Sequence, residues 1–135
     1  MKTSVLIKTG SRYPVNRKKI RHTVNQFLQK TGLAGWQVSL TFVGERQIKQ
    51  LAQKHLGHQE EHVVLAFPLE VAETKIPFPL ISEGKSVLGE IVISYPQARQ
   101  LAQAKNTMVD DIINSLVEYG LGHLIGQNPN WKLSN

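Results

Sequence analysis

The sequence predicts an α+β fold, a small mixed β-sheet packed with helices, in a single domain that spans residues 1–135. Segments with the alternation or β-branched content of strands are interleaved with segments whose apolar residues recur at helical spacing. The 135 residues, of which 41% are hydrophobic, suffice for one ordinary core, and no change of composition marks a second domain. The predicted order is β-α-β-α-β-loop-β-α-α, which is typical of the α+β class.

The first half of the chain predicts two strands and two helices. A short apolar run over residues 5–7 predicts a strand, and apolar residues at helical spacing between Pro14 and Gly32 predict the first helix. Residues 36–42 alternate between apolar and polar, as in a half-buried strand. Residues 45–56 return to helical spacing and predict the second helix.

The second half begins with a buried strand. Residues 63–67 are apolar, partly β-branched and followed by Pro68, which favours a short strand over a helix. The proline-rich stretch 68–86 predicts a long loop. Residues 87–94 predict another strand, and Pro96 suits the first turn of a short third helix.

The last helix is predicted to be the central core helix, capped by Asn106 or Thr107. Asp110 and Asp111 suit its positive N-terminal end, and we interpret them as partners of the helix dipole rather than as catalytic carboxylates. The apolar residues of this helix fall on one stripe: Val109, Ile112, Ile113, Leu116, Val117 and Gly120.

Positive charge gathers near the start of the chain. Sixteen Lys and Arg against ten Asp and Glu give a formal charge of +6 and a pI near 9.7, a balance that favours polyanions such as nucleic acid. A solvated charged helix face explains the same charges without any partner, and both interpretations stay open. The residues that we expect to touch RNA phosphates without reading bases are Arg17, Lys18, Lys19 and Arg21.

The chain contains no cysteine, which excludes disulfides, thiolate metal ligands and a cysteine nucleophile. The apolar run 5–7 is too short for the core of a signal peptide, and no later run approaches the roughly 20 apolar residues of a membrane span. We therefore expect a soluble, cytoplasmic protein with no membrane partner.

Four stretches of the sequence carry a family resemblance: WQVSLTFVGERQIKQLAQKHLG, VVLAFPLE, LGEIVIS and YGLGHLIG. In order and spacing they resemble the successive blocks of the bacterial YbeY family of rRNA maturation endoribonucleases, over roughly residues 35–129. The FP pair followed later by LGEIVIS is the most specific part. The resemblance implies a YbeY-like fold and a metal-dependent hydrolase that acts on RNA.

The family motif HGxLHLxGxDH supplies three histidine ligands and leaves one metal position open for water. In this chain the three ligand positions fall on Tyr119, His123 and Pro129. Proline has no side-chain donor atom and a neutral tyrosine is a poor ligand for zinc, so His123 would be a single good ligand. We therefore expect Tyr119 and His123 one turn apart on the last helix, facing a degenerate cleft with Leu56 and Glu90 nearby and no bound metal cofactor.

This chain departs from the family pattern at other positions as well. The arginine of a YRxxD segment, which the resemblance links to RNA chemistry, is replaced by Leu56, and the aspartate of LGDI is replaced by Glu90, which keeps the carboxylate. The chain also ends at Asn135, where the family usually continues into a further acidic segment. The losses at the metal-ligand positions and at Leu56 favour a pseudoenzyme.

The polar segment HLGHQEEH offers an alternative metal site beside the former one. His55, His58 and His62, with Glu60 or Glu61, could hold zinc. A solvated polar loop is the simpler interpretation, because a flexible loop lacks the surrounding hydrogen bonds that orient metal ligands.

Three functional classes remain open. We prefer an RNA-binding factor of rRNA maturation and ribosome biogenesis, with little or no nuclease activity and with rRNA or the small ribosomal subunit as its partner. An active endoribonuclease with zinc at the histidine cluster is the second class, and a protein-interaction module is the third. Salt-dependent RNA binding separates the first class from the third. Metal analysis separates the second class from both.

Overall fold

The secondary structure elements follow one another in the predicted order. The computed structural model describes residues 5–10, 12–57, 62–68 and 87–126, without the side chain of Leu56. The predicted loop after Pro68 therefore lies outside the described residues. The elements are β1 (Val5–Lys8), α1 (Arg17–Lys30), β2 (Gln37–Val43), α2 (Glu45–Leu56), β3 (Val64–Pro68), β4 (Val87–Ser94), α3 (Tyr95–Lys105) and α4 (Val109–Ile125).

The four strands form one mixed sheet in the order β1-β2-β4-β3. Strands β1, β2 and β4 are parallel, and β3 runs antiparallel to β4 at the edge. The last residue of β3 is Pro68, which an edge strand tolerates because its outer side needs no backbone donor. The predicted α+β class with a small mixed sheet is confirmed.

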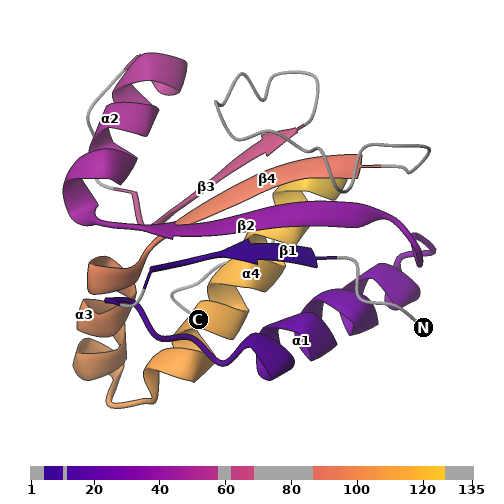
Figure 1. Ribbon diagram of the computed structural model, residues 1–135, viewed down its shortest axis with the longest axis horizontal. Helices are drawn as coiled ribbons and strands as arrows, with labels where there is room; N and C mark the ends of the chain where they lie inside the picture. Colours follow the sequence, from indigo (N-terminus) through magenta and orange to yellow (C-terminus); the bar gives the residue numbers. More distant parts are fainter. Residues whose placement is uncertain (1–4, 11, 58–61, 69–86, 127–135) are drawn as a thin grey trace.

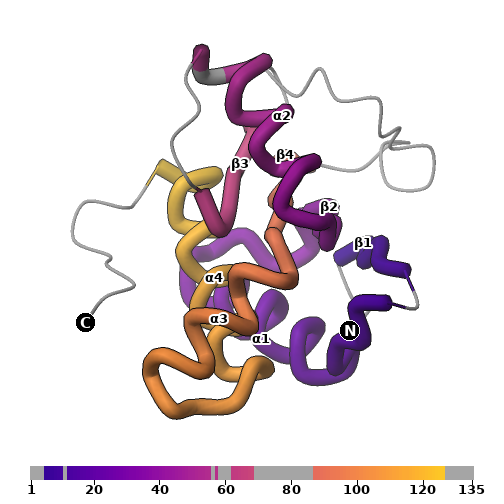
Figure 2. Tube along the Cα trace, turned by 90° about the vertical axis from the view of Figure 1, so that its left-hand side faces the viewer, coloured from indigo at the N-terminus to yellow at the C-terminus, as the bar shows by residue number. Residues whose placement is uncertain are grey.

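The helices form two unequal layers on the sheet. Helices α1, α3 and α4 cover one face, while α2 covers the other, as two perpendicular views agree (Figures 1 and 2). The larger core lies on the side of α4, where Leu116 and Leu121 are completely buried. The smaller core under α2 consists of Val43, Ile48, Ala52, Leu65, Phe67 and Val92.

Helix α4 approaches the sheet closely because Gly120 has no side chain. A Cβ added there would lie 2.9 Å from both Cδ1 and Cγ2 of Ile91 on β4. Real Cβ atoms essentially never come that close to such atoms, so the glycine permits this packing. The close approach sets the next turn of α4 beside β3.

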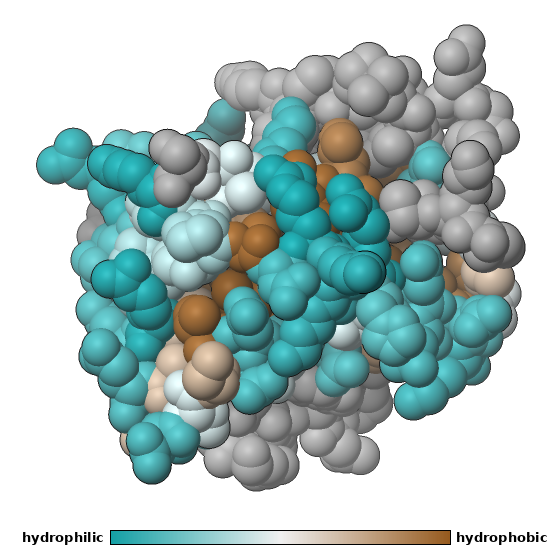
Figure 3. Space-filling view, turned by 60° about the horizontal axis from the view of Figure 1, so that its bottom comes forward, coloured by the Kyte–Doolittle hydropathy of each residue, from teal (hydrophilic) through white to brown (hydrophobic). Residues whose placement is uncertain are grey.

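The surface that faces the viewer in Figure 3 is mostly hydrophilic, with apolar side chains confined to narrow strips among the hydrophilic ones. Met108 is the one large apolar side chain that is exposed among the described residues. No helix in that part of the chain combines the length and the apolar character needed to cross a membrane.

The prediction that Asn106 or Thr107 caps the start of the last helix was wrong. The N-cap of α4 is Met108, while Asn106 ends α3 in the left-handed conformation at φ 56° and ψ 46°. Asparagine tolerates this conformation better than most residues with a side chain, so it suits a helix C-terminus. The sequence thus indicated a helix end at Asn106, but this residue ends α3 and does not begin α4.

Candidate active-site cleft at the edge of β3

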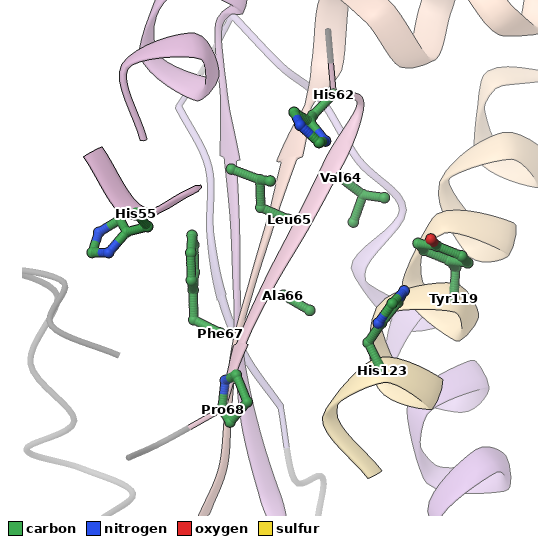
Figure 4. A pocket seen from close by; sticks show the side chains of 9 residues that line it. All are labelled: His55, His62, Val64, Leu65, Ala66, Phe67, Pro68, Tyr119 and His123. Carbon is green, nitrogen blue, oxygen red and sulfur yellow. The ribbon is translucent and has the colours of Figure 1, made fainter. Parts of the chain in front are cut away.

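A pocket of about 480 Å³ surrounds the outer edge of β3. Because β3 pairs only with β4 among the described residues, side chains from both faces of the sheet reach its edge. Helix α2 contributes one wall and α4 the other (Figure 4). The lining residues are His55, His62, Val64, Leu65, Ala66, Phe67, Pro68, Tyr119 and His123.

The wall from α4 contains Tyr119 and His123, one helical turn apart on the same side of the helix. Their rings lie 4.5 Å apart between centroids at an interplanar angle of 71°, an edge-to-face contact. Tyr119 is half-buried and packs against the core, while His123 is exposed at the mouth of the pocket. The sequence predicted this pair on one side of the last helix, and the structure brings the two rings together.

The opposite wall comes from the end of α2. The ring of His55 lies 4.9 Å from the ring of Phe67, between centroids, on the side of the sheet that α2 covers (Figure 4). The Nε2 atom of His55 is buried and has no hydrogen-bond partner among the described residues. His62 lines the same pocket just before β3 begins. Two histidines of the predicted alternative metal site therefore line the same pocket as Tyr119 and His123.

Glu90 does not join Tyr119 and His123. It is completely buried on β4, where its register partner on β3 is Phe67 and its Oε2 accepts a hydrogen bond of 3.4 Å from the hydroxyl of Thr41. Side chains alternate along β4, so Glu90 faces the same side as Val92 in the core under α2. The sheet thus separates this carboxylate from the side chains on α4.

The described residues do not fit the metal centre that the resemblance implies. That centre requires three imidazole nitrogens, and α4 supplies one imidazole, from His123, beside the phenol of Tyr119. No three His, Cys, Asp or Glu side chains in the described part of the chain come close enough together to hold a metal ion. His55 and His62 line the pocket without completing such a group.

Several predicted site residues lie outside the described part. Pro129 and His58 are among them, as are Glu60 and Glu61. Leu56 is the last residue of α2, but its side chain is not described. The predicted roles of these residues stay predictions.

The predicted RNA-binding cations all lie on α1, and several make contacts within the protein. An Nη1 of Arg17 donates to the carbonyl oxygen of Ile7 at 3.3 Å, and the Nζ of Lys19 lies 3.1 Å from a carboxylate oxygen of Asp111. Arg21 is half-buried with its Nε enclosed. Their role in binding RNA stays a prediction.

Sequence reasoning missed the part that β3 plays in the pocket. The alternation of VLAFP places Val64, Ala66 and Pro68 on one side and Leu65 and Phe67 on the other. A short apolar run ended by proline is a signal for an edge strand, because proline is confined to such positions in sheets. That signal could have identified β3 as the exposed rim of a cleft.

Known proteins resemble this chain over most of its length. The family described as "Endoribonuclease YbeY" matches residues 7–130. A protein of Syntrophus aciditrophicus named Endoribonuclease YbeY is 31% identical over 114 residues, which cover 84% of this chain and 68% of that protein. The protein of the same name from Moorella thermoacetica is 33% identical over 120 residues, covering 84% of this chain and 76% of the relative.

A solved structure supports the same fold. The solution structure of a Thermotoga maritima protein superposes with a TM-score of 0.58 and 22% sequence identity, and the match covers 97% of this chain and 78% of that one. At this identity the likeness concerns the fold alone.

Proposed function

Because this chain belongs to the YbeY family of endoribonucleases, and because the described residues of its cleft do not supply the donors of a three-histidine metal centre, we propose that it is an RNA-binding factor of rRNA maturation with little or no nuclease activity. Its partner in this proposal is rRNA, free or within the small ribosomal subunit. Its place of action is the cytoplasm.

The ring pair on α4 carries this proposal. A hydrolytic metal needs several good ligands aimed at one point, together with an open position for water. In this cleft the half-buried ring of Tyr119 packs against the imidazole of His123. The family motif has its first histidine ligand at the position of Tyr119. A neutral phenol is a poor zinc ligand, so His123 alone does not provide a tight site.

The retained fold supports an RNA-binding role over complete loss of function. The family acts on RNA, and the chain keeps a formal charge of +6. Such a charge attracts a phosphate backbone without any catalytic group. Binding of this kind does not depend on hydrolysis.

The experiment combines metal analysis with RNA binding and cleavage. Purified protein is assayed for zinc per chain, for binding to a labelled single-stranded rRNA fragment across a salt series, and for cleavage with and without added zinc. We expect salt-dependent binding, zinc far below one ion per chain and no cleavage above buffer. Absence of RNA binding would refute the proposal.

A remodelled zinc nuclease is the second candidate, because His55 and His62 both line the pocket. This candidate predicts about one zinc ion per chain and cleavage that is lost on chelation. His55→Ala would then abolish cleavage and zinc binding together, whereas the preferred proposal expects neither activity to be present in the unmodified protein.

A further inference from the structure

The exposed side of α2 forms a basic groove that lies apart from the pocket at β3. The groove has a volume of about 320 Å³ and is lined by Arg46, Lys49, Gln50, Gln53 and Lys54. All five side chains are exposed, and they recur every three or four positions on one side of the helix. The opposite side of α2 is buried in the smaller core. The groove is therefore a continuous surface on a firmly packed helix.

The cations of this groove are available to an external partner. Within the described part of the chain, Arg46, Lys49 and Lys54 form no ion pair and no side-chain hydrogen bond. No acidic side chain lines the groove, and Glu45, four residues before Lys49 in the first turn of α2, forms no ion pair with it. Among the described residues, no ion pair therefore neutralises the charge of this surface.

Two of the cations on α1 have partners within the protein, whereas Lys18 forms no ion pair in the described part of the chain. Arg17 donates to the backbone carbonyl of Ile7, and Lys19 pairs with Asp111 of α4. A cation that is paired with a carboxylate must give up that partner before it can neutralise a phosphate. Removing such a cation therefore changes external binding less than removing a free one.

Helices α1 and α2 also differ in where they lie relative to the pocket at β3. Lys54 lines the groove and His55, the next residue of α2, lines the pocket at β3, so the C-terminal end of α2 contributes to both, although they share no lining residue. By contrast, Lys19 contacts α4 at Asp111, and twelve residues of helix place His123 about 18 Å further along. Helix α1 also lies on the other face of the sheet from α2 (Figure 1).

The chemistry of the groove fits a single nucleic-acid strand. Residues 46 to 54 extend about 12 Å along the helix, the axial rise of roughly three to four stacked nucleotides. Lys and Arg neutralise phosphates, and glutamine amides donate to phosphate and sugar oxygens.

We propose that the exposed side of α2 is the phosphate-contact surface that leads single-stranded RNA to the pocket at the edge of β3. This inference rests on the proposed RNA-binding function and names the surface that performs it. The contacts are to the backbone, so the surface tolerates any base sequence.

Two matched triple variants test the inference. The first removes the charges of α2 by Arg46→Gln, Lys49→Gln and Lys54→Gln, and the second removes the same number from α1 by Arg17→Gln, Lys18→Gln and Lys19→Gln. Glutamine keeps a good helix propensity, and all six positions are exposed. The probe is fluorescent single-stranded oligo-uridine, titrated by anisotropy across a salt series.

We expect the α2 variant to lose at least tenfold in affinity at low salt. Its slope of log affinity against log salt should fall by about 2, because single strands contribute about 0.7 per neutralised phosphate. The α1 variant should lose less than half as much in slope. An equal or larger loss in the α1 variant overturns the inference, as does an unchanged α2 variant. With either of these outcomes, RNA binding by the unmodified protein still supports the proposed function. If the unmodified protein binds no RNA, both the proposed function and the inference are refuted.

A second measurement does not depend on affinity. Because the chain has no cysteine, Gln53→Cys on α2 and Gln26→Cys on α1 each provide a single attachment point for a thiol-reactive photo-crosslinker, and both native side chains are exposed. We expect crosslinking to oligo-uridine from position 53 and several-fold less from position 26. The reverse order, or equal yields, contradicts the inference.

Discussion

The ring of Tyr119 meets the ring of His123 edge to face, with 4.5 Å between their centroids and an angle of 71° between their planes. The contact joins two positions where the family motif has histidines. In this chain the pair acts as a packed aromatic wall of the cleft, with one nitrogen-bearing ring at its mouth. Helix α4 thus presents both side chains to the same pocket.

Restoring the missing histidines should restore metal binding. The double substitution Tyr119→His and Pro129→His returns two imidazoles to positions that the family motif uses for its metal. We expect it to bind about one zinc ion per chain by titration calorimetry, while Tyr119→His alone binds more weakly. Adding His123→Ala to the double variant should abolish the gain. If the double variant binds no zinc, the assignment of ligand positions is wrong.

Alanine at Gly89 should strongly destabilise the protein. Gly89 has φ +149°, which favours glycine, and a Cβ there would collide with the backbone carbonyl oxygen of Phe67 on the neighbouring strand. We expect the free energy of unfolding to fall by at least about 2 kcal/mol in urea denaturation. Gly10→Ala is the control, because a Cβ there meets nothing within 4 Å, and it should change stability by less than about 0.5 kcal/mol. Similar effects for the two variants would contradict the packing of β3 on β4.

Alanine at Gly120 should also destabilise the protein, although alanine favours helices by up to about 1 kcal/mol over glycine. The new Cβ would press on Cγ1 and Cγ2 of Ile91, which are close to the backbone and cannot swing away. We expect a net loss of about 1 kcal/mol or more. Combining it with Ile91→Val should cost less than the sum of the two changes, because valine lacks Cδ1, the third Ile91 atom that the new Cβ would meet. Strict additivity would place the two residues out of contact.

The contacts between α1 and α4 should contribute unequally to stability. The side chains of Lys19 and Asp111 are 42% and 56% exposed, so their ion pair is screened by solvent. A double-mutant cycle should give a coupling below about 1 kcal/mol that decreases further with salt. Leu116→Ala, at a completely buried position of α4, should cost about 2–5 kcal/mol in the same assay. A coupling that rivals the leucine substitution would show the ion pair to be far less solvated than its exposure indicates.

The elements of the fold were largely predictable because their signals are local. Helix α2 and strand β4 begin and end where apolar periodicity places them. The roles of Asn106 and Glu90 were not predictable in the same way. Asn106 occupies a turn between two helices, and asparagine is common both at the start and at the end of a helix. The side of the sheet that Glu90 faces depends on how the strands are arranged.

The same distinction between local signals and long-range pairing decides which parts of the site could be predicted. Tyr119 and His123 were placed together because both lie on one helix. The wall formed by His55 and Phe67 depends on β3 lying at the sheet edge, which is a property of long-range pairing. The basic groove of α2 does have a local signal, the recurrence of Arg46, Lys49 and Gln53 at helical spacing, but the more numerous cations of α1 obscured it. The extent of the single domain stays a prediction.

The separate small core under α2 has a consequence for how the protein opens. Within the described residues, Ile48 and Ala52 of α2 pack in that core against four side chains from the strands, whereas α1, α3 and α4 share the larger one. Native-state hydrogen exchange should therefore reveal two cooperative units, with the amides of α2 opening at a lower free energy than those of α4. A helix that detaches alone would carry His55 and the basic groove away from the sheet together. Transient opening of this unit would then widen the cleft while the opposite layer stays folded.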